Sequence, residues 1–219
     1  MRWGNGIREA YAVTPEEIET LFTRSDDSFA FARWGRPICP VVFGVDDATL
    51  GVVRGAIQAV CELAGHHMGE MDAELGSNLM MFFFLDWAEL LEVPGMDRLV
   101  PDLAPLVERL QAADANQYRF FRFDERGAIK ACFVFLRMDQ HLSDVPAQTL
   151  ALSQITQSIL LWSDMAFQDR SPLMVANDTT ILRPDIAALI RAAYDPVLPH
   201  AAQDASHALR LSARIEVTQ

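Results

Sequence analysis

The sequence has few basic residues and no long apolar run. Its 18 Lys and Arg residues stand against 30 Asp and Glu residues, which gives a formal net charge of −12. Nucleic-acid binding requires clustered Lys and Arg that neutralise phosphates, so the composition argues against a nucleic-acid partner. The longest apolar run covers residues 79–85 and is far too short to span a bilayer, so we expect no membrane insertion.

Cysteine is scarce, and a secretion signal is not evident. Cys39, Cys61 and Cys132 lie inside apolar segments without the spacing of metal ligands, so we expect buried free thiols. The first 22 residues contain no apolar stretch of the kind found in signal peptides, and acidic residues interrupt them. Both features predict a cytoplasmic protein, because thiols stay reduced in that compartment.

The common catalytic and cofactor motifs are also missing. The chain has no G-x-S-x-G elbow around a serine, no phosphate-binding glycine loop and no dinucleotide fingerprint. His141, His200 and His207 are scattered over presumed loops and the C-terminal end, where surface histidines are expected. The residues therefore point to no catalytic group and to no cofactor.

What the sequence does contain is a clear order of helical and extended patterns. Apolar residues recur at helical spacing in five segments, and three further segments read as a strand entry, a buried strand and a hairpin. The predicted helices cover residues 15–22, 48–65, 101–113, 150–167 and 183–196, and the extended segments cover residues 28–45, 77–87 and 118–137. This order predicts an α+β fold with a mixed sheet of about four to five strands packed with helices.

The pattern divides the chain into three parts. Residues 1–28 form an N-terminal helical segment, in which Thr14 and Glu17 match a capping box. Residues 29–199 form a single α+β domain. Residues 200–219 are polar and rich in small residues, so we expect a loosely held C-terminal tail.

The best candidates for a metal site are His66, His67 and Glu70. His66 and Glu70 share the i, i+4 spacing of one helical face, but a metal site needs at least three converging ligands. The segment follows Gly65, a predicted helix C-cap, and is expected to be exposed. The histidines fit an ordinary helix C-terminus as well, so we predict no metal.

The predicted helix over residues 150–167 carries an uncharged polar cluster. Gln154, Gln157 and Ser158 lie at i, i+3 and i+4 and therefore share a face. If this face is buried, the side chains must bond to neighbours or water. If it is exposed, it offers an uncharged surface to another protein. The sequence leaves the two alternatives open.

Three stretches of the chain resemble one known family, in the same order. They are "FARWGRPICPVVFG" at residues 31–44, "SQITQSILLWSD" at residues 153–164 and "DIAALIRAAYDPVLP" at residues 185–199. Together they resemble the bacterial domain-of-unknown-function family 2927 over roughly residues 29–199. The family's middle helix, placed after a mixed sheet, is similar to the active-site helix of zincin metallopeptidases. The resemblance therefore implies a zincin-like scaffold, by analogy of fold.

The same resemblance implies that the catalytic equipment is missing. Zincin chemistry needs H-E-x-x-H, in which two histidines hold zinc and the glutamate polarises water. The corresponding run here contains no histidine, and Ser153 and Gln154 stand where the family has an acidic pair. Neutral amides and hydroxyls do not act as a general base near neutral pH.

The leading hypothesis is a non-enzymatic cytoplasmic protein on a degenerate metallopeptidase-like scaffold. It would act through contacts with another protein, and the candidate contact face is Gln154, Gln157 and Ser158. A second polar cluster is expected to be structural, with Arg33 paired to Asp164 or Asp195 so that helix and sheet are held together. This cluster consists of Arg33, Trp34, Asp164, Tyr194 and Asp195.

Two alternatives from other functional classes stay open. The first is a hydrolase whose site uses carboxylates such as Glu70, Asp72 or Asp164, or a metal. The second is a protein that binds a small molecule in a pocket between the long helix and the sheet. The oligomeric state is not predicted.

Overall fold

A four-stranded mixed sheet organises the computed structural model, which describes residues 13–218. The first three strands in the sheet are parallel to one another, and the fourth is antiparallel to its neighbour. In spatial order they are β2 (Pro40–Phe43), β3 (Leu79–Phe84), β5 (Ile129–Arg137) and β4 (Gln117–Phe123). The α+β prediction, with four to five strands in a mixed sheet, is confirmed.

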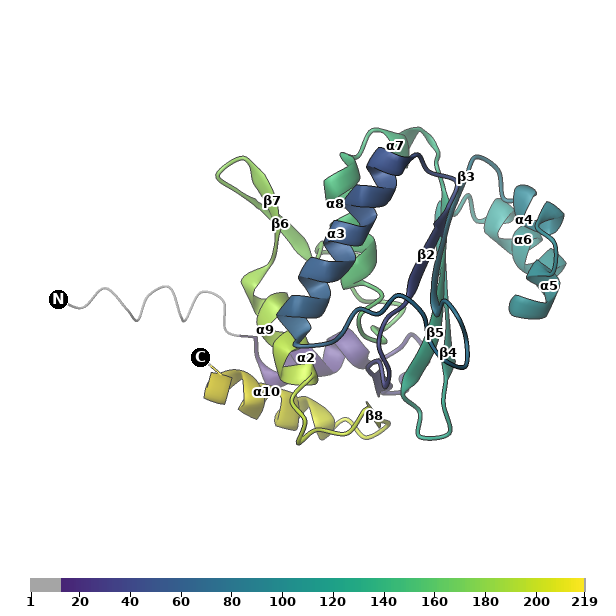
Figure 1. The fold of residues 1–219 in the computed structure, drawn as a ribbon. Coiled ribbons are helices and arrows are strands. Elements are labelled where there is room, and N and C mark those ends of the chain that lie inside the picture. The colour runs from purple at the N-terminus through teal and green to yellow at the C-terminus, as the bar shows by residue number, and fades with distance from the viewer. Residues whose placement is uncertain (1–12, 219) are drawn as a thin grey trace.

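Helices cover both faces of this sheet (Figure 1). Along β3, Leu79 and Met81 belong to one apolar core and Phe82 and Phe84 to another, because successive side chains of a strand point to opposite faces. The first core also takes in α3 (Asp47–Ala64), α8 (Ala147–Thr156) and α9 (Pro184–Ala193), and the second takes in α4 (Glu89–Glu92), α5 (Met96–Leu99) and α6 (Leu103–Ala112). This two-sided burial explains why β3 is apolar throughout.

Local signals fix the ends of several elements where the sequence predicts them. Helix α2 (Pro15–Phe22) begins with a capping box, in which the Thr14 and Glu17 side chains each accept a hydrogen bond from the other's backbone N–H. Helix α3 ends at Gly65, which has a φ of 63°. Gly127, with a φ of 78°, lies in the turn between β4 and β5. Glycine adopts this left-handed conformation without the steric cost of a side chain.

The predicted helix over residues 150–167 is only half right. Helix α8 ends at Thr156, and the chain continues in an irregular course. Leu160 forms a bridge with Arg33, and the Leu161 N–H donates to the carbonyl of Ala32 in β1 (Phe31–Ala32) at 2.8 Å. These pairings with a distant segment replace the helical hydrogen bonds that local apolar spacing predicts.

The C-terminal tail predicted over residues 200–219 is also wrong. Strand β8 (Ala201–Ala202) pairs with β1, and α10 (His207–Thr218) follows it. Leu211 and Ile215 of α10 are buried in the same core as Ile18 of α2. The described parts of the predicted N-terminal segment and tail therefore belong to the core of the central domain. Residues 1–12 of the predicted N-terminal segment lie outside the described residues.

Two short features complete the path of the chain. Helix α7 (Gln140–Ser143) precedes α8, and a hairpin of β6 (Leu173–Ala176) and β7 (Thr179–Leu182) projects from the body (Figure 1). No helix in the range 13–218 is both long enough and apolar enough to cross a membrane. The three cysteines are free and buried, as the sequence predicts.

Candidate functional site

The Arg33 and Trp34 pair anchors the irregular segment that follows α8. The Trp34 indole N–H donates to the Ser158 carbonyl at 2.9 Å, and the Tyr194 hydroxyl donates to the Ile159 carbonyl at 2.9 Å. The Arg33 guanidinium lies over the Tyr194 ring, 5.4 Å from its centre. Four of the five predicted structural residues, Arg33, Trp34, Tyr194 and Asp195, therefore meet in one place, where they hold the segment after α8 against β1.

The predicted ion pairs of Arg33 differ from the contacts in the structure. Arg33 Nη2 donates to the backbone carbonyls of Leu198, at 2.9 Å, and Asp195, at 3.4 Å, and not to a carboxylate. Asp164 is bonded elsewhere, since its carboxylate accepts from the Ser25 N–H at 3.0 Å and from the Ser25 hydroxyl. Pairing of Arg33 with Asp164 is therefore wrong, and Asp195 contributes its carbonyl.

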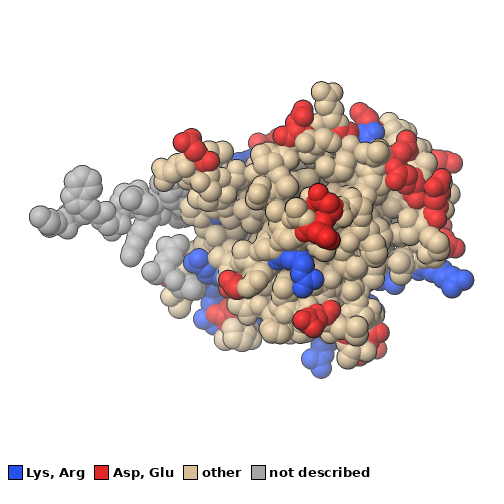
Figure 2. All heavy atoms as spheres, turned by 45° about the horizontal axis from the view of Figure 1, so that its top comes forward, with Lys and Arg blue, Asp and Glu red and all other residues tan. Residues whose placement is uncertain are grey.

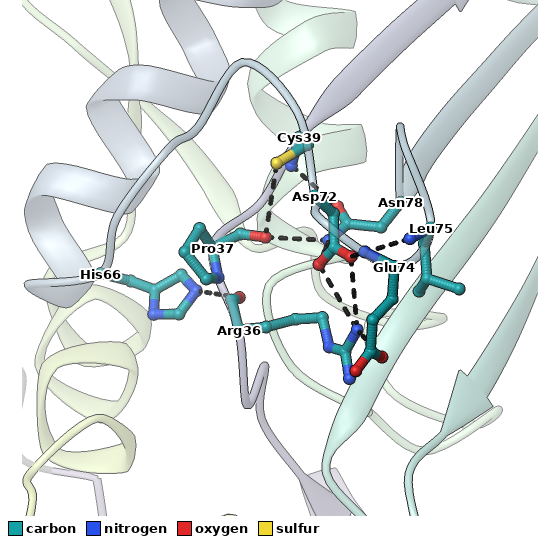
Figure 3. Close-up of polar contacts among 8 residues, drawn as sticks. All are labelled: Arg36, Pro37, Cys39, His66, Asp72, Glu74, Leu75 and Asn78. Atoms are coloured by element: carbon teal, nitrogen blue, oxygen red, sulfur yellow. Dashed lines mark hydrogen bonds and ion pairs between the residues drawn. The ribbon is translucent and has the colours of Figure 1, made fainter.

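The weak metal candidates lie in the loop after α3 and do not converge. The His66 ring is directed at the Arg36 carbonyl (Figure 3), and its Nε2 atom lies 2.9 Å from the carbonyl oxygen. His67 and Glu70 are exposed. Among residues 13–218, no group of three or more His, Cys, Asp or Glu side chains is placed to hold a metal ion.

The same loop is fastened to the strand entry by a polar cluster (Figure 3). The Asn78 amide donates to the Pro37 carbonyl at 2.8 Å and accepts the Cys39 N–H at 2.8 Å. Asp72 pairs with Arg36 at 3.4 Å and accepts backbone N–H groups from its own loop. Burial is the largest single influence on the pKa of Asp72 and raises it, but backbone hydrogen bonds from Leu75 and Glu74 together with Arg36 outweigh burial and lower the pKa. These contacts are those of a structural connection.

The polar cluster of Gln154, Gln157 and Ser158 lies at the end of α8 and just after it. The cluster faces the edge strand β4, and Arg119 of that strand binds all three of its members. Arg119 Nη2 donates to Gln154 Oε1 at 2.6 Å, Nε donates to Ser158 Oγ at 3.0 Å, and Nη1 donates to Gln157 Oε1 at 3.5 Å. Gln154 and Ser158 are each 2% exposed, while Gln157 is partly buried. The prediction of a contact face is therefore wrong for Gln154 and Ser158, because these side chains are already bonded within the fold.

Arg119 is the residue that the sequence analysis missed. None of the ion pairs among residues 13–218 involves it, and its three side-chain acceptors are neutral. Burial lowers the pKa of the guanidinium, which nonetheless stays charged at neutral pH. An arginine between aromatic residues in an edge strand is the only sequence signal, and it does not reveal the neutral partners.

A cleft of about 850 Å³ opens beside this arginine. One wall is the end of α8 with Ser153, Gln154 and the C-cap residue Gln157, and the other is the beginning of β4 with Gln117 and Arg119. The β6–β7 hairpin, the segment after α8 and helix α7 close its remaining sides, through Leu173, Met174, Thr180, Ala166, Phe167, His141 and Leu142. The cleft therefore joins elements that lie far apart in the sequence.

A second, more aromatic pocket of about 390 Å³ adjoins the cleft. The two share Arg119, Gln157 and Phe167 along their common border. Phe121, Phe123 and Trp162 line the second pocket, and the Trp162 and Phe167 rings pack edge to face with centres 5.0 Å apart. Arg24 and Asp164 add one charge of each sign.

Phe167 has a backbone conformation that bulky residues rarely adopt. Its φ is 66°, in the left-handed region, where a non-glycine residue costs about 1–3 kcal/mol. The conformation places its ring against Trp162 at the border of the two pockets. Backbone strain of this kind clusters at functional sites, so the strain at Phe167 supports a functional role for the border between the two pockets.

Acidic side chains are spread widely over the surface. Figure 2 shows them gathered at the end of the molecule where α4, α5 and α6 lie. This segment carries Asp86, Glu89, Glu92, Asp97, Asp102 and Glu108. Neither pocket of the candidate site is lined by any of these acidic residues.

Comparisons with protein-family models, curated proteins and solved structures found no match. The resemblance to the bacterial family 2927 and the zincin-like scaffold stay predictions. The candidate site is accordingly defined by its own residues: the cleft, the adjoining aromatic pocket and Arg119 between them.

Proposed function

We propose that the protein binds a small organic molecule in the cleft between α8 and β4. The observation that carries this proposal is the cleft itself, whose volume of about 850 Å³ falls within the range of about 300–1,000 Å³ typical of ligand sites. It lies where the sequence analysis places the pocket of a small-molecule binder, between the helix and the sheet. A small-molecule binder is one of the two alternatives that the sequence leaves open.

The lining of the cleft combines apolar and polar side chains, with the polar ones in the majority. Leu150, Leu173 and Met174 offer apolar area, and Ser153 and Gln157 offer hydrogen-bonding groups at the same opening. Apolar contact supplies affinity in such sites, while a small number of fixed polar groups orients the ligand. The Gln157 side chain donates to Ser153 Oγ at 3.0 Å, which fixes its orientation before a ligand arrives.

Contacts with a partner protein are less well supported by the same geometry. A partner cannot reach Gln154 or Ser158 without opening the fold, since both are buried beneath the α8–β4 contact. A small molecule needs to reach only the partly buried Gln157 and Arg119, which both line the cleft.

Hydrolysis is also less well supported. Nucleophilic or general-base chemistry needs a nucleophile and a base in hydrogen-bond contact. Within residues 13–218, none of the side-chain hydrogen bonds joins a histidine to a serine or a carboxylate of the cleft. Asp164, the carboxylate that lines the cleft, is occupied by Ser25, and Asp72 lies in the separate cluster with Arg36.

A blocking variant tests the proposal. Ser153→Trp places an indole inside the cleft, whereas Gln148→Trp places the same group on an exposed position of α8 outside the cleft lining. A library of small organic molecules is screened by thermal shift, because a ligand of the native state raises its apparent stability. We expect compounds that stabilise the unmodified protein and the Gln148→Trp variant but not the Ser153→Trp variant. Compounds that stabilise all three proteins equally bind elsewhere and contradict the proposal.

A further inference from the structure

Arg119 has hydrogen-bonding capacity left over. A guanidinium carries five N–H donors, and the three bonds to Ser158, Gln157 and Gln154 use one N–H on each of its three nitrogens. One N–H on each terminal nitrogen therefore has no acceptor within the described part of the chain. The two terminal nitrogens of a guanidinium can together bind the two oxygens of one carboxylate.

The charges around the two pockets leave an excess of one positive unit. Arg24 and Arg119 are the cationic side chains of the lining, and Asp164 is the anionic one. In a chain with 30 acidic residues, the structure nevertheless brings no carboxylate into an ion pair with Arg119 among residues 13–218. A ligand with a single negative charge balances this excess, whereas a doubly charged ligand carries one negative charge more than the lining compensates.

The aromatic pocket lies directly beside the charged group. Arg119 and Phe121 are two residues apart on β4, so their side chains point to the same face and are separated by roughly 7 Å along the strand. Trp162 and Phe167 extend the aromatic surface on the other side of the pocket. A ligand whose charge contacts Arg119 therefore has its remaining atoms within reach of aromatic rings.

We infer that the ligand is a monocarboxylic acid with an aromatic or otherwise apolar body. Its carboxylate accepts from the two remaining N–H groups of Arg119, and its body lies against Phe121, Trp162 and Phe167. This inference rests on the proposed binding function and adds the chemical class of the ligand. The neutral oxygens of Gln154, Gln157 and Ser158 hold the guanidinium in place and leave its charge for the ligand.

Titration calorimetry with defined probes tests the class. The probes are 4-phenylbutyrate, octanoate, the neutral 4-phenylbutanamide and inorganic phosphate. We expect both acids to bind, and the amide and phosphate to bind at least about tenfold more weakly, since a hydrogen bond to a charged group accounts for such a factor.

A charge variant tests the proposed role of Arg119 in ligand binding without removing the arginine from the fold. Gln157→Glu keeps the size of the side chain and the arginine itself, but places an internal carboxylate beside the guanidinium. Gln168→Glu adds the same charge at another position of the cleft lining, where the side chain bonds to Asp164 and Met165 and not to Arg119. We expect Gln157→Glu to weaken the binding of the acids by about tenfold or more, and Gln168→Glu to have a smaller effect.

Each result has a defined consequence. If the neutral amide binds as tightly as the acids, the inferred ligand class is wrong but the proposed function still holds. The same follows if phosphate binds as tightly as the acids. If neither acid binds, but other compounds bind and Ser153→Trp abolishes their binding, the inferred ligand class is wrong and the cleft is still a binding site. If no compound of either experiment binds at the cleft, both proposals fail.

Discussion

The Nη2 atom of Arg119 lies 2.6 Å from the Oε1 atom of Gln154. The bond joins the edge strand of the sheet to the helix that packs beside it, and Gln154 completes the link by donating its amide to Gln117 at 2.9 Å. Two amides and a hydroxyl thus surround a cation that has no acidic partner in the described structure. This arrangement makes Gln154 part of the fold and Arg119 the centre of the candidate site.

Gln154→Ala is expected to destabilise the protein by roughly 1–3 kcal/mol. The substitution removes the acceptor of a charged donor and leaves part of the Arg119 guanidinium without a partner, which costs more than an ordinary hydrogen bond. The free energy of unfolding, measured by urea denaturation, tests this. Gln148→Ala on the exposed side of the same helix is the control and should change it by less than about 0.5 kcal/mol. Equal effects of the two substitutions would show that the Arg119–Gln154 bond contributes nothing.

Ile159→Ala is expected to cost on the order of 2–4 kcal/mol. Ile159 is 1% exposed and lies in the segment held by Trp34 and Tyr194, so that its truncation leaves a cavity beside contacts that cannot easily move. Denaturant unfolding of the variant gives the value. A loss below about 0.5 kcal/mol would mean that the segment repacks and that the anchoring contacts are weak.

The thiols are expected to react slowly in the native protein. Burial raises the pKa of Cys61 to about 11 and that of Cys132 to about 12, so the reactive thiolate is scarce at neutral pH. Ellman's reagent should therefore label all three cysteines only after denaturant is added. Rapid labelling of one thiol per chain in native buffer would show that one of the three cysteine sites opens. Loss of this rapid labelling in Cys61→Ala would show that the site is the one in α3.

His207 is expected to make the protein less stable in acid. His207 is 2% exposed, neither ring nitrogen has a hydrogen-bond partner among residues 13–218, and burial together with Arg210 and Arg33 lowers its pKa to about 4. The unfolded chain, with a histidine pKa near 6.5, therefore binds the proton more readily. Stability is fully present above about pH 6.5 and is lost as pH falls towards 4, by roughly 3 kcal/mol in all.

Urea denaturation between pH 7 and pH 4 measures this loss in the unmodified protein and in His207→Leu. The free energy of unfolding of His207→Leu should depend less steeply on pH than that of the unmodified protein. It should keep some slope, because burial also lowers the pKa of His66 and His200. An unchanged slope would place the acid sensitivity in other groups.

The protein is expected to purify without stoichiometric zinc. His66 is directed at the Arg36 carbonyl, and His67 and Glu70 are exposed without a converging third ligand among residues 13–218. Elemental analysis of the purified protein decides the matter. About one zinc per chain that disappears in His66→Ala would contradict this prediction.

The sequence by itself determined the elements whose signals are local. The Thr14 capping box, the Gly65 helix end and the Gly127 turn each depend on bonds or dihedral angles within a few residues, and each lies where it is predicted. The unbroken apolar run of β3 likewise predicts burial on both faces, because any polar residue there would lack water.

Only the tertiary structure decided where α8 ends and how the C-terminal residues pack. Apolar spacing continues past Thr156, but the Trp34, Ala32 and Arg33 contacts with the following segment outweigh the local preference for helix. Helix α10 looks like a polar tail because it buries only one narrow face, and that face finds its partners in α2 and α9.

The candidate site depends most strongly on tertiary structure. Gln154 and Ser158 share a helical face in the sequence, but nothing in their spacing tells whether water, a partner or another segment covers that face. Arg119, 35 residues before Gln154, covers it through the position of β4 at the edge of the sheet. A buried polar group requires a hydrogen-bond partner, but which residue provides it depends on the tertiary structure and cannot be predicted from the sequence.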